Sequence, residues 1–321
     1  AAKNINTFIS NTSTDREVVT VPLSHSFGLG RLRCIMMAGG MIILTDGFLF
    51  PRKIFDSIDD WAATGLSSVP AGLALLFRIS GDKISEYADQ LAYLEIGSAP
   101  MPLDHKERLM RLLPKTRICM HYGLTEASRS AFIEFHTSPE RLGSIGKPAP
   151  NVKIRIVGPE DTELDPGQSG TIAVQGSMVM SEYWNNSHET SNVLKDGWLY
   201  TSDLGYKDQE GYIYLQGRSA DLINVGGMNV SPVEVEEALM RLDHVQDCAC
   251  AAVPDPMGMS GHAVKAFIVS TSQDDSKPSQ EEIVRFLRSQ LEPYKVPTIF
   301  QWLDSIPRTS SGKLQRQLLP D

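Results

Sequence analysis

The first 122 residues alternate between short, continuous apolar runs and longer amphipathic segments, and this alternation constrains the fold more than any other feature. The apolar runs lie at 18–21, 41–44, 66–69, 91–96 and 117–121. The amphipathic segments lie at 51–63, 71–79 and 103–113. Strands that are apolar on both faces are typical of parallel sheets with helices on each side. The sequence therefore predicts an α/β fold with a doubly covered, mostly parallel sheet.

Two short loops follow strands of this predicted sheet. The segment Gly97-Ser98-Ala99-Pro100 follows the run at 91–96, and Tyr122-Gly123-Leu124-Thr125-Glu126 follows the run at 117–121. Ligands of parallel α/β sheets bind beyond the carboxyl ends of the strands. We therefore expect both loops to open onto one crevice.

The pattern changes twice further along the chain. Short alternating strands at 152–157, 170–175 and 211–216, separated by turn signals such as Asp165-Pro166-Gly167, predict a small antiparallel β-subdomain. Beyond it, Ser231-Pro232-Val233-Glu234 has the residues of a capping box and predicts a helix as far as Leu242, within a compact α+β unit. The predicted domains are a partial α/β subdomain at 1–142, a β-rich subdomain at 143–220 and a small α+β domain at 221–321.

Composition excludes some classes of partner. The chain has 30 Lys and Arg against 39 Asp and Glu, a net charge of −9, and no basic stripe, which argues against nucleic acid or an anionic membrane as partner. The longest apolar run, at 34–44, falls short of the roughly 20 residues that a membrane-spanning helix needs. Of the four cysteines, Cys248 and Cys250 fall in an apolar segment and are read as small hydrophobic residues, and reduced thiols suit the cytoplasm.

A series of short motifs carries the chemical information. In chain order they are Tyr122-Gly123-Leu124-Thr125-Glu126, Tyr200-Thr201-Ser202-Asp203, Gly217-Arg218-Ser219-Ala220-Asp221, Gly226-Gly227-Met228-Asn229 and Ser311-Gly312-Lys313. Each string alone is weak evidence. In this order and at this spacing they resemble the adenylate-forming ligases, the superfamily that includes acyl- and aryl-CoA synthetases, and the resemblance covers nearly the whole chain.

The resemblance implies an ATP- and Mg²⁺-dependent ligase that joins a carboxylic acid to CoA through an acyl-AMP intermediate. It makes Glu126 the magnesium ligand and Thr125 a hydrogen-bonding partner of phosphate. It places Tyr122, followed by Gly123, against the adenine ring. These three roles are expectations from the motif.

Further roles follow from the same resemblance. Gly97, Ser98, Ala99 and Pro100 match the adenine-binding loop of the family. Asp203 would accept hydrogen bonds from the ribose hydroxyls, and Arg218 would reach the same sugar or the phosphate.

At the reacting end, His25 aligns with a position that borders the acyl pocket, although a lone histidine is more often a structural residue. Lys313 would contact the carboxylate and the α-phosphate, since an ammonium on a flexible stem suits a transient contact.

The C-terminal domain of the family rotates between the two half-reactions, and Asp221 lies at the position of its hinge residue. Gly226, Gly227 and Met228 match the loop that lines the thiol tunnel in CoA ligases. This string favours CoA as acceptor. An acyl-AMP ligase that loads a carrier protein remains an alternative.

The glycine- and threonine-rich phosphate loop of the family does not occur in this sequence. We therefore expect a fragment of a larger ligase that lacks an N-terminal portion and is prone to self-association. The third hypothesis is a non-catalytic module that binds AMP or acyl-AMP.

Overall fold

The computed structural model describes residues 1–256, 261–271, 277–309 and 312–320. The chain divides into two compact units. The first, called here the N-terminal unit, comprises 1–201 and 205–215, and the second, the C-terminal unit, comprises 202–204 and 216–321. Each unit is described by itself.

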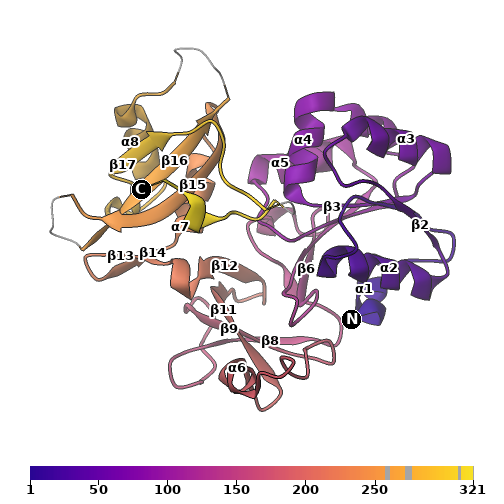
Figure 1. Ribbon diagram of the computed structural model, residues 1–321, viewed down its shortest axis with the longest axis horizontal. Helices are drawn as coiled ribbons and strands as arrows, with labels where there is room; N and C mark the ends of the chain where they lie inside the picture. Colours follow the sequence, from indigo (N-terminus) through magenta and orange to yellow (C-terminus); the bar gives the residue numbers. More distant parts are fainter. Residues whose placement is uncertain (257–260, 272–276, 310–311, 321) are drawn as a thin grey trace. The chain divides into compact units, whose positions relative to one another are not determined.

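A seven-stranded, mostly parallel sheet forms the centre of the N-terminal unit (Figure 1). Its strand order is β2-β1-β3-β4-β5-β6-β7. The strands are β1 (Arg16–Val19), β2 (Met41–Leu44), β3 (Gly65–Ser68), β4 (Tyr93–Ile96), β5 (Arg117–Tyr122), β6 (Ala131–Glu134) and β7 (Lys147–Pro148). The first five strands are parallel and the last two pair antiparallel, which confirms the α/β prediction.

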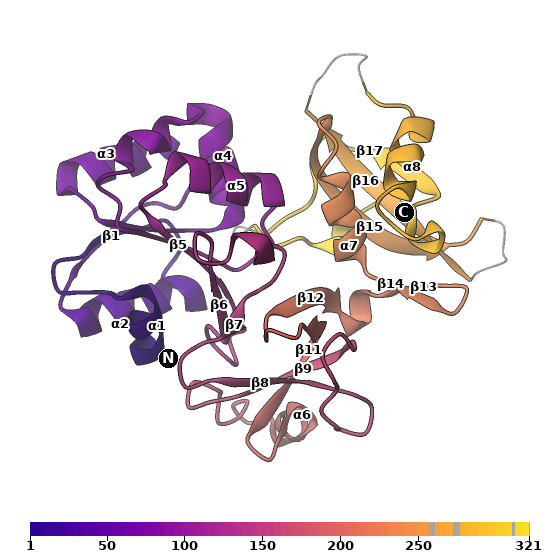
Figure 2. The same ribbon diagram turned by 180° about the vertical axis from the view of Figure 1, so that it is seen from behind.

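Helices cover both faces of this sheet, as Figures 1 and 2 show. The helices are α1 (Ala2–Ile9), α2 (Ser26–Ala38), α3 (Pro51–Trp61), α4 (Pro70–Ser80) and α5 (Leu103–Leu112). Helices α3, α4 and α5 lie on one face, and α1 and α2 lie on the other. Prolines begin α3 and α4 at the first helical turn, where a missing N–H costs nothing.

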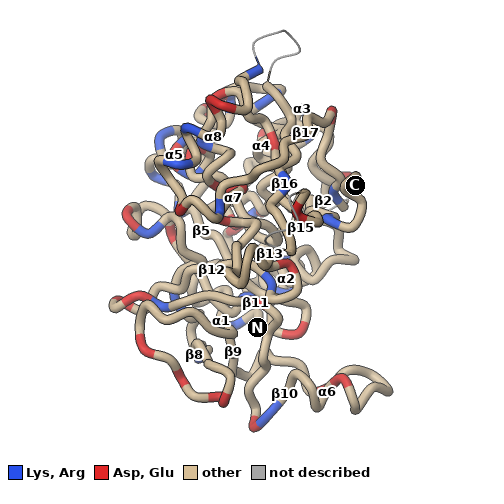
Figure 3. The backbone as a smooth tube through the Cα atoms, turned by 90° about the vertical axis from the view of Figure 1, so that its left-hand side faces the viewer, with Lys and Arg blue, Asp and Glu red and all other residues tan. Residues whose placement is uncertain are grey.

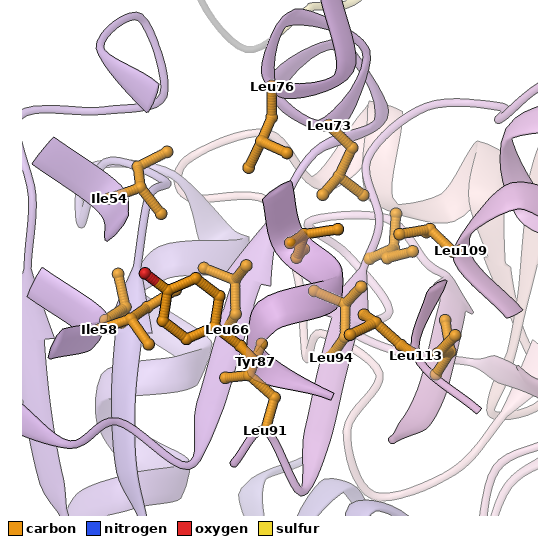
Figure 4. Close-up of a cluster of buried hydrophobic side chains, with 14 of the residues drawn as sticks. Ile54, Ile58, Leu66, Leu73, Leu76, Tyr87, Leu91, Leu94, Leu109 and Leu113 are labelled. Atoms are coloured by element: carbon orange, nitrogen blue, oxygen red, sulfur yellow. The ribbon is translucent and has the colours of Figure 1, made fainter. Parts of the chain in front are cut away.

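Burial of aliphatic side chains stabilises this packing. In Figure 4, Ile54 and Ile58 of α3 and Leu73 of α4 converge on Leu66 and Leu94 of the sheet. All five are almost completely buried. Burial of a side chain of this size contributes about 1.5–3 kcal/mol, so the cluster fixes the helices on the sheet.

A smaller sheet follows in the chain. It contains β8 (Lys153–Val157), β9 (Gly170–Gln175), β10 (Leu194–Lys195), β11 (Trp198–Lys207) and β12 (Ile213–Arg218), with α6 (Ser187–Val193) between β9 and β10. The pairs β8–β9 and β10–β11 are antiparallel, as the alternating pattern predicts.

The C-terminal unit is the predicted small α+β structure. Its elements are the hairpin β13 (Ile223–Val225) and β14 (Met228–Val230), α7 (Pro232–Leu239), β15 (Val245–Pro254), β16 (His262–Ser270), α8 (Gln280–Arg288) and β17 (Ile299–Trp302). Strand β15 pairs antiparallel and β17 parallel with β16. Helix α7 ends at Leu239, earlier than the predicted Leu242, because the chain turns at Met240. Ser279 and Glu282 form a complete capping box at α8.

Charge and cysteine placement agree with the composition. Figure 3 shows basic and acidic residues interspersed in both units. The four cysteines are free and buried, as small hydrophobic residues are. Within the described part of the chain, no helix has both the length and the apolar character that crossing a membrane requires.

Candidate active site

The two loops singled out in the sequence lie side by side at the carboxyl edge of the large sheet. They follow β4 and β5, which are parallel neighbours with Ile96 opposite Met120. A Cβ atom at Gly97 would lie 2.1 Å from Cε1 of His121, so only glycine fits there. Ser98 has a φ of 78°, a left-handed conformation that is rare outside glycine and that concentrates at functional sites.

The loop that begins at Tyr122 is a tight turn. The amide of Leu124 donates to the carbonyl of Ala127 over 3.0 Å. A Cβ atom at Gly123 would lie 2.5 Å from the backbone nitrogen of Arg129, so glycine is required here too. Tyr122 is packed into the core of the unit, whereas Thr125 is exposed. The turn therefore combines a buried aromatic ring at 122 with an exposed hydroxyl at 125.

Glu126 is held by two contacts. Its Oε1 accepts a hydrogen bond of 2.9 Å from the hydroxyl of Tyr183, and its backbone carbonyl accepts one of 2.8 Å from the amide of Met180. Burial and this hydrogen bond raise the pKa of Tyr183, so the phenol stays a donor. The sequence analysis missed Tyr183, since a contact across 57 residues leaves no local signal.

His25 lies at the N-terminal cap of α2 and is half-buried. The helix can begin here because Gly28 has no Cβ, which would lie 2.3 Å from the carbonyl oxygen of Pro22. Next to His25, the buried ring of Phe27 meets the ring of His121 edge-on, with 4.7 Å between the centroids. The candidate acyl-pocket position is thus connected through Phe27 to the end of β5.

Beneath this edge lies a buried network of charged residues that the sequence analysis did not predict. Arg31 lies 2.5 Å from Glu17 and 2.9 Å from Glu95, and all three side chains are completely buried. Arg129 lies 3.1 Å from Glu95, and Nδ1 of His121 lies 2.8 Å from the same carboxylate. We call Glu17, Arg31, Glu95, Arg129 and His121 the buried network.

Further donors complete the buried network. The hydroxyls of Ser67 and Tyr93 donate to Glu17 over 2.5 and 2.8 Å. Arg129 donates to the backbone carbonyls of Ser26 and Phe27, over 3.2 and 3.0 Å. These two bonds tie the first turn of α2 to the end of β4, because Arg129 also binds Glu95.

The charges of the buried network balance. Burial alone would raise the pKa of Glu95, but the guanidinium groups of Arg129 and Arg31 outweigh it and hold that pKa far below its ordinary value. Burial, followed by the charge of Arg129, lowers the pKa of His121 below 6.5, so the ring is neutral at pH 7. Two carboxylates therefore face two guanidinium groups, and the net charge is zero. One signal could have revealed this network: a glutamate inside each of two apolar strands needs a buried cation.

In the C-terminal unit, the structure brings Asp203 and Arg218 together. Nε of Arg218 lies 3.6 Å from Oδ1 of Asp203. Arg218 is 58% exposed while Asp203 is nearly buried, so the carboxylate is fixed and the guanidinium can move.

The string Gly226-Gly227 forms the turn of the β13–β14 hairpin. Their φ values are 58° and 88°, which a two-residue turn of this type requires. The amide of Gly227 donates to the side chain of Asn224 over 2.9 Å, and Met228 is exposed beside the turn. The glycines thus have a local structural reason in addition to the predicted role in a thiol tunnel.

Lys313 is exposed on a loop closed by backbone bonds. The amide of Thr309 donates to the carbonyl of Lys313 over 2.8 Å, and the amide of Lys313 donates to the hydroxyl of Thr309 over 3.1 Å. Among the residues that the structure describes, no carboxylate forms an ion pair with Lys313. Asp221 lies in a 3₁₀ turn, Ser219–Asp221, and contacts Arg316 at 3.8 Å.

Comparison with known proteins identifies the sequence pattern. The profile of the AMP-binding enzyme family matches residues 1–184, and that of the AMP-binding enzyme C-terminal domain matches residues 234–313. A long-chain-fatty-acid–CoA ligase of Bacillus subtilis is 36% identical over 303 residues, which cover 93% of this chain and 52% of that protein. A feruloyl-CoA synthase of Amycolatopsis is 33% identical, over 94% of this chain and 60% of that protein. The chain thus spans about half the length of the curated relatives it matches.

Solved structures give the same result. The o-succinylbenzoate CoA synthetase of Bacillus subtilis, in complex with its acyl-adenylate intermediate, superposes with a TM-score of 0.87 at 30% identity, covering 100% of this chain and 63% of that one. ATP-bound MatB from Rhodopseudomonas palustris superposes with a TM-score of 0.88 at 28% identity, covering 99% and 62%.

Proposed function

This chain belongs to the AMP-binding enzyme family, and from that premise we propose that it acts in ATP-dependent ligation of a carboxylic acid to CoA. In the first step, a carboxylate oxygen attacks the α-phosphorus of ATP, the bond to pyrophosphate breaks, and acyl-AMP forms. In the second step, the sulfur of CoA attacks the acyl carbon, the bond to AMP breaks, and the thiol proton passes to solvent.

The exposed side chain of Lys313 is the observation that supports this proposal. It is an exposed ammonium without an ion-pair partner among the described residues, on a loop fixed by its own backbone bonds. A cation in this state is available to neutralise the negative charges of the carboxylate and the α-phosphate as one attacks the other. We assign Lys313 that role.

From the family pattern, we assign the nucleotide to the loops after β4 and β5 and to Asp203 and Arg218. Gly97 and Gly123 let the ring of His121 and the backbone of Arg129 pack against these loops, which fixes the shape of the loops. The family pattern assigns the adenine ring to Tyr122. Asp203 is nearly buried, so its carboxylate is fixed for the ribose hydroxyls, with Arg218 beside it.

Glu126 fits magnesium by donor chemistry, and Thr125 offers a hydroxyl to a phosphate oxygen. Magnesium takes hard oxygen ligands and needs only one or two carboxylates when phosphate oxygens and waters complete its shell. Tyr183 orients one oxygen of Glu126 through the 2.9 Å hydrogen bond. When bound, the ion would neutralise charge on the phosphates. The chain's own contribution is the fixed carboxylate and the exposed Thr125 hydroxyl.

For the thiol we propose CoA, with the β13–β14 turn at Gly226 and Gly227 and the exposed Met228 along its path. Glycines leave room beside the backbone for a thin thiol arm. A carrier protein as acceptor is tested by offering CoA and a phosphopantetheinyl protein side by side, where faster thioester formation on the protein would overturn the choice.

We assign the acid to the part of α2 that carries His25 and Phe27. The names of the relatives cover long-chain fatty acids, ferulate and, in the Bacillus licheniformis relative, 2-succinylbenzoate. We propose a fatty or aryl carboxylic acid. The free cysteines fit a reducing compartment, and we propose the cytoplasm.

Self-association is proposed on a separate observation. Strand β2 is the edge of the large sheet, and Met41 and Leu44 on it are exposed beside Met36 and Met37 of α2. An exposed apolar edge favours association of two copies. Light scattering that gives the mass of a single chain at all concentrations would exclude it.

The test of function is magnesium-dependent exchange of pyrophosphate into ATP, with a panel of fatty, aryl and small acids. We expect exchange with at least one acid and its loss in Lys313→Ala, by on the order of 10²–10³-fold. AMP binding without exchange by any acid would instead favour a non-catalytic AMP-binding module. Calorimetry with AMP on both variants separates loss of binding from loss of chemistry.

A further inference from the structure

Arg316 joins three parts of the C-terminal unit through one guanidinium group. Its Nη2 lies 2.6 Å from the carboxylate of Glu236 on α7, and its Nε donates to the carbonyl of Cys250 on β15 over 3.1 Å. Its Nη1 lies 3.8 Å from Oδ2 of Asp221. A planar guanidinium can hold several acceptors in fixed directions, which an ammonium cannot do.

Arg316 is three residues from Lys313 in the chain. The chain doubles back around Lys313, because Arg308 before it and Leu314 after it form an antiparallel bridge. Thr309 and Lys313 are joined by a backbone hydrogen bond and by a second bond from the amide of Lys313 to the hydroxyl of Thr309. Any shift of Arg316 is therefore passed along a short, bonded segment to the lysine.

Asp221 lies within the C-terminal unit, shortly after the chain enters it for the last time at Gln216. The N-terminal unit ends its last segment at Leu215, and the C-terminal unit resumes at Gln216 within β12. The 3₁₀ turn Ser219–Asp221 follows β12 directly. We call this 3₁₀ turn the junction turn, and the segment that carries Lys313 the lysine loop. The contact of Arg316 with Asp221 connects the two within the C-terminal unit.

Arg308 offers a matched comparison on the same loop. It lies 2.7 Å from Asp247 and donates to the carbonyl of Gly312 over 3.1 Å. It thus anchors the loop that carries Lys313, but on β15 and not on the junction turn. Both arginines are partly exposed, so the two anchors differ mainly in their partners.

We propose that Arg316 is a positioning residue for adenylation: it fixes the loop of Lys313 to the turn of Asp221, so that the lysine and the junction turn move as one body. This inference rests on the proposed function. Glu236 and the Cys250 carbonyl hold the guanidinium in place, and Asp221 is the acceptor through which the turn is coupled.

The first experiment is a double-mutant cycle on pyrophosphate exchange. Arg316→Gln is expected to lower kcat on the order of 10²-fold, with the KM for ATP changed less than about twofold, since misplacement of a reacting group by about 1 Å has an effect of this size. In the Lys313→Ala background, the same substitution should have no further effect. If the loss of kcat in the double variant is instead the product of the two single losses, Arg316 does not act through Lys313.

The second half-reaction separates positioning from general damage. Arg316→Gln should form thioester from supplied acyl-AMP at the wild-type rate, because that step does not use Lys313 in the proposed mechanism. Equal loss in both half-reactions would assign Arg316 a merely structural role. Arg316→Lys, which keeps the charge and loses the fixed directions, should recover part of the exchange rate.

Two matched variants test the tie to the junction turn. Arg308→Gln should lower exchange less than Arg316→Gln, since it frees the loop from β15 only. Asp221→Asn should slow exchange, and Arg316→Gln on that background should add little. Equal effects of both arginines, or additive effects with Asp221→Asn, would overturn the tie.

Hydrogen exchange gives a readout without turnover. The amides of Gly312 and Lys313 are bonded within the loop and should exchange at least about tenfold faster in Arg316→Gln than in wild type. If these two amides are protected equally in both proteins, the positioning role is refuted, even if the rate of pyrophosphate exchange falls. If amide exchange is faster in Arg316→Gln but the wild type shows no pyrophosphate exchange with any acid, the proposed function is refuted and the structural tie stands.

Discussion

Both units contain arginine-centred ion pairs, but the two sets are built in opposite ways. In the buried network, the side chains of Glu17, Arg31 and Glu95 are completely inaccessible to solvent. In the C-terminal unit, Arg308 and Arg316 with Asp221, Glu236 and Asp247 form what we call the loop anchor. There the side chains of Arg316 and Glu236 are 21% and 16% exposed, and that of Asp221 is 37% exposed.

The difference shows which of the two sets of ion pairs is fixed and which can rearrange. A buried pair is strongly destabilised when one partner is removed, because the other charge stays buried and uncompensated. A partly exposed pair exchanges its partner for water at small cost. The buried network therefore gives a rigid base to the loops after β4 and β5, whereas the ion pairs of the loop anchor can exchange partners with water.

The largest expected effect is on the buried network. Glu95→Gln leaves two guanidinium groups facing one carboxylate, and we expect the free energy of unfolding of the N-terminal unit to fall by about 3–5 kcal/mol. Urea-induced unfolding followed by tryptophan fluorescence and circular dichroism measures it. A loss below about 1 kcal/mol would erase the contrast with the loop anchor.

A second effect concerns Glu236 in the loop anchor. Burial raises its pKa from 4.5 to about 7, against the opposing charge of Arg316. Because the folded-state pKa is raised, this group's contribution to stability is complete below pH 4.5 and is lost as the pH rises through 7, at up to about 1.4 kcal/mol per pH unit. The difference in unfolding free energy between wild type and Glu236→Gln, measured from pH 5 to pH 8, should show this slope.

A pH-independent difference between those two proteins would contradict the assignment. It would mean that the carboxylate of Glu236 is ionised throughout and that Arg316 compensates its burial fully.

His121 should show the opposite slope in the N-terminal unit. Its pKa is lowered from 6.5, chiefly by burial and then by Arg129, so its contribution to stability is present above pH 6.5 and is lost as the pH falls below it. We expect a smaller effect than for Glu236, at most about 1.4 kcal/mol per pH unit. Unfolding of wild type and His121→Gln, compared between pH 7 and pH 5, measures it, and parallel pH profiles would refute it.

The smallest effect is expected at Arg308. Its pair with Asp247 is about one-third exposed on both sides. Arg308→Gln should therefore lower the free energy of unfolding of the C-terminal unit by no more than about 1 kcal/mol. Thermal unfolding monitored by calorimetry checks this, with Arg308→Lys as the charge-preserving control. A loss as large as that of Glu95→Gln would place both sets of pairs in one class.

The sequence predicted what depends on local pattern and on sheet topology. The neighbouring positions of the loops after β4 and β5 followed from two parallel strands in succession, and the structure confirms them. The helix predicted as far as Leu242 ends at Leu239, because a capping signal marks its start and nothing comparable marks its end.

Apart from the signal of a glutamate inside each of two apolar strands, the partners within the buried network and the contacts of Arg316 could not be predicted from the sequence, for a physical reason. Arg31 meets Glu17 and Glu95, and Arg316 meets Glu236 and Asp221, across separations that only the folded chain closes. No periodicity connects such residues. The roles of Lys313, Asp203 and the other motif residues toward ligands remain predictions from the family pattern.

Gly97 and His121 share a single volume at the sheet edge, since a methyl group on the first would occupy the place of the second's imidazole. An engineer who wishes to reshape this part of the molecule must exchange both at once, with a larger residue at 97 matched by a smaller one at 121. Randomising position 97 alone, with His121 in place, would therefore return only glycine, whereas a smaller residue at 121 opens the space that a larger residue at 97 needs.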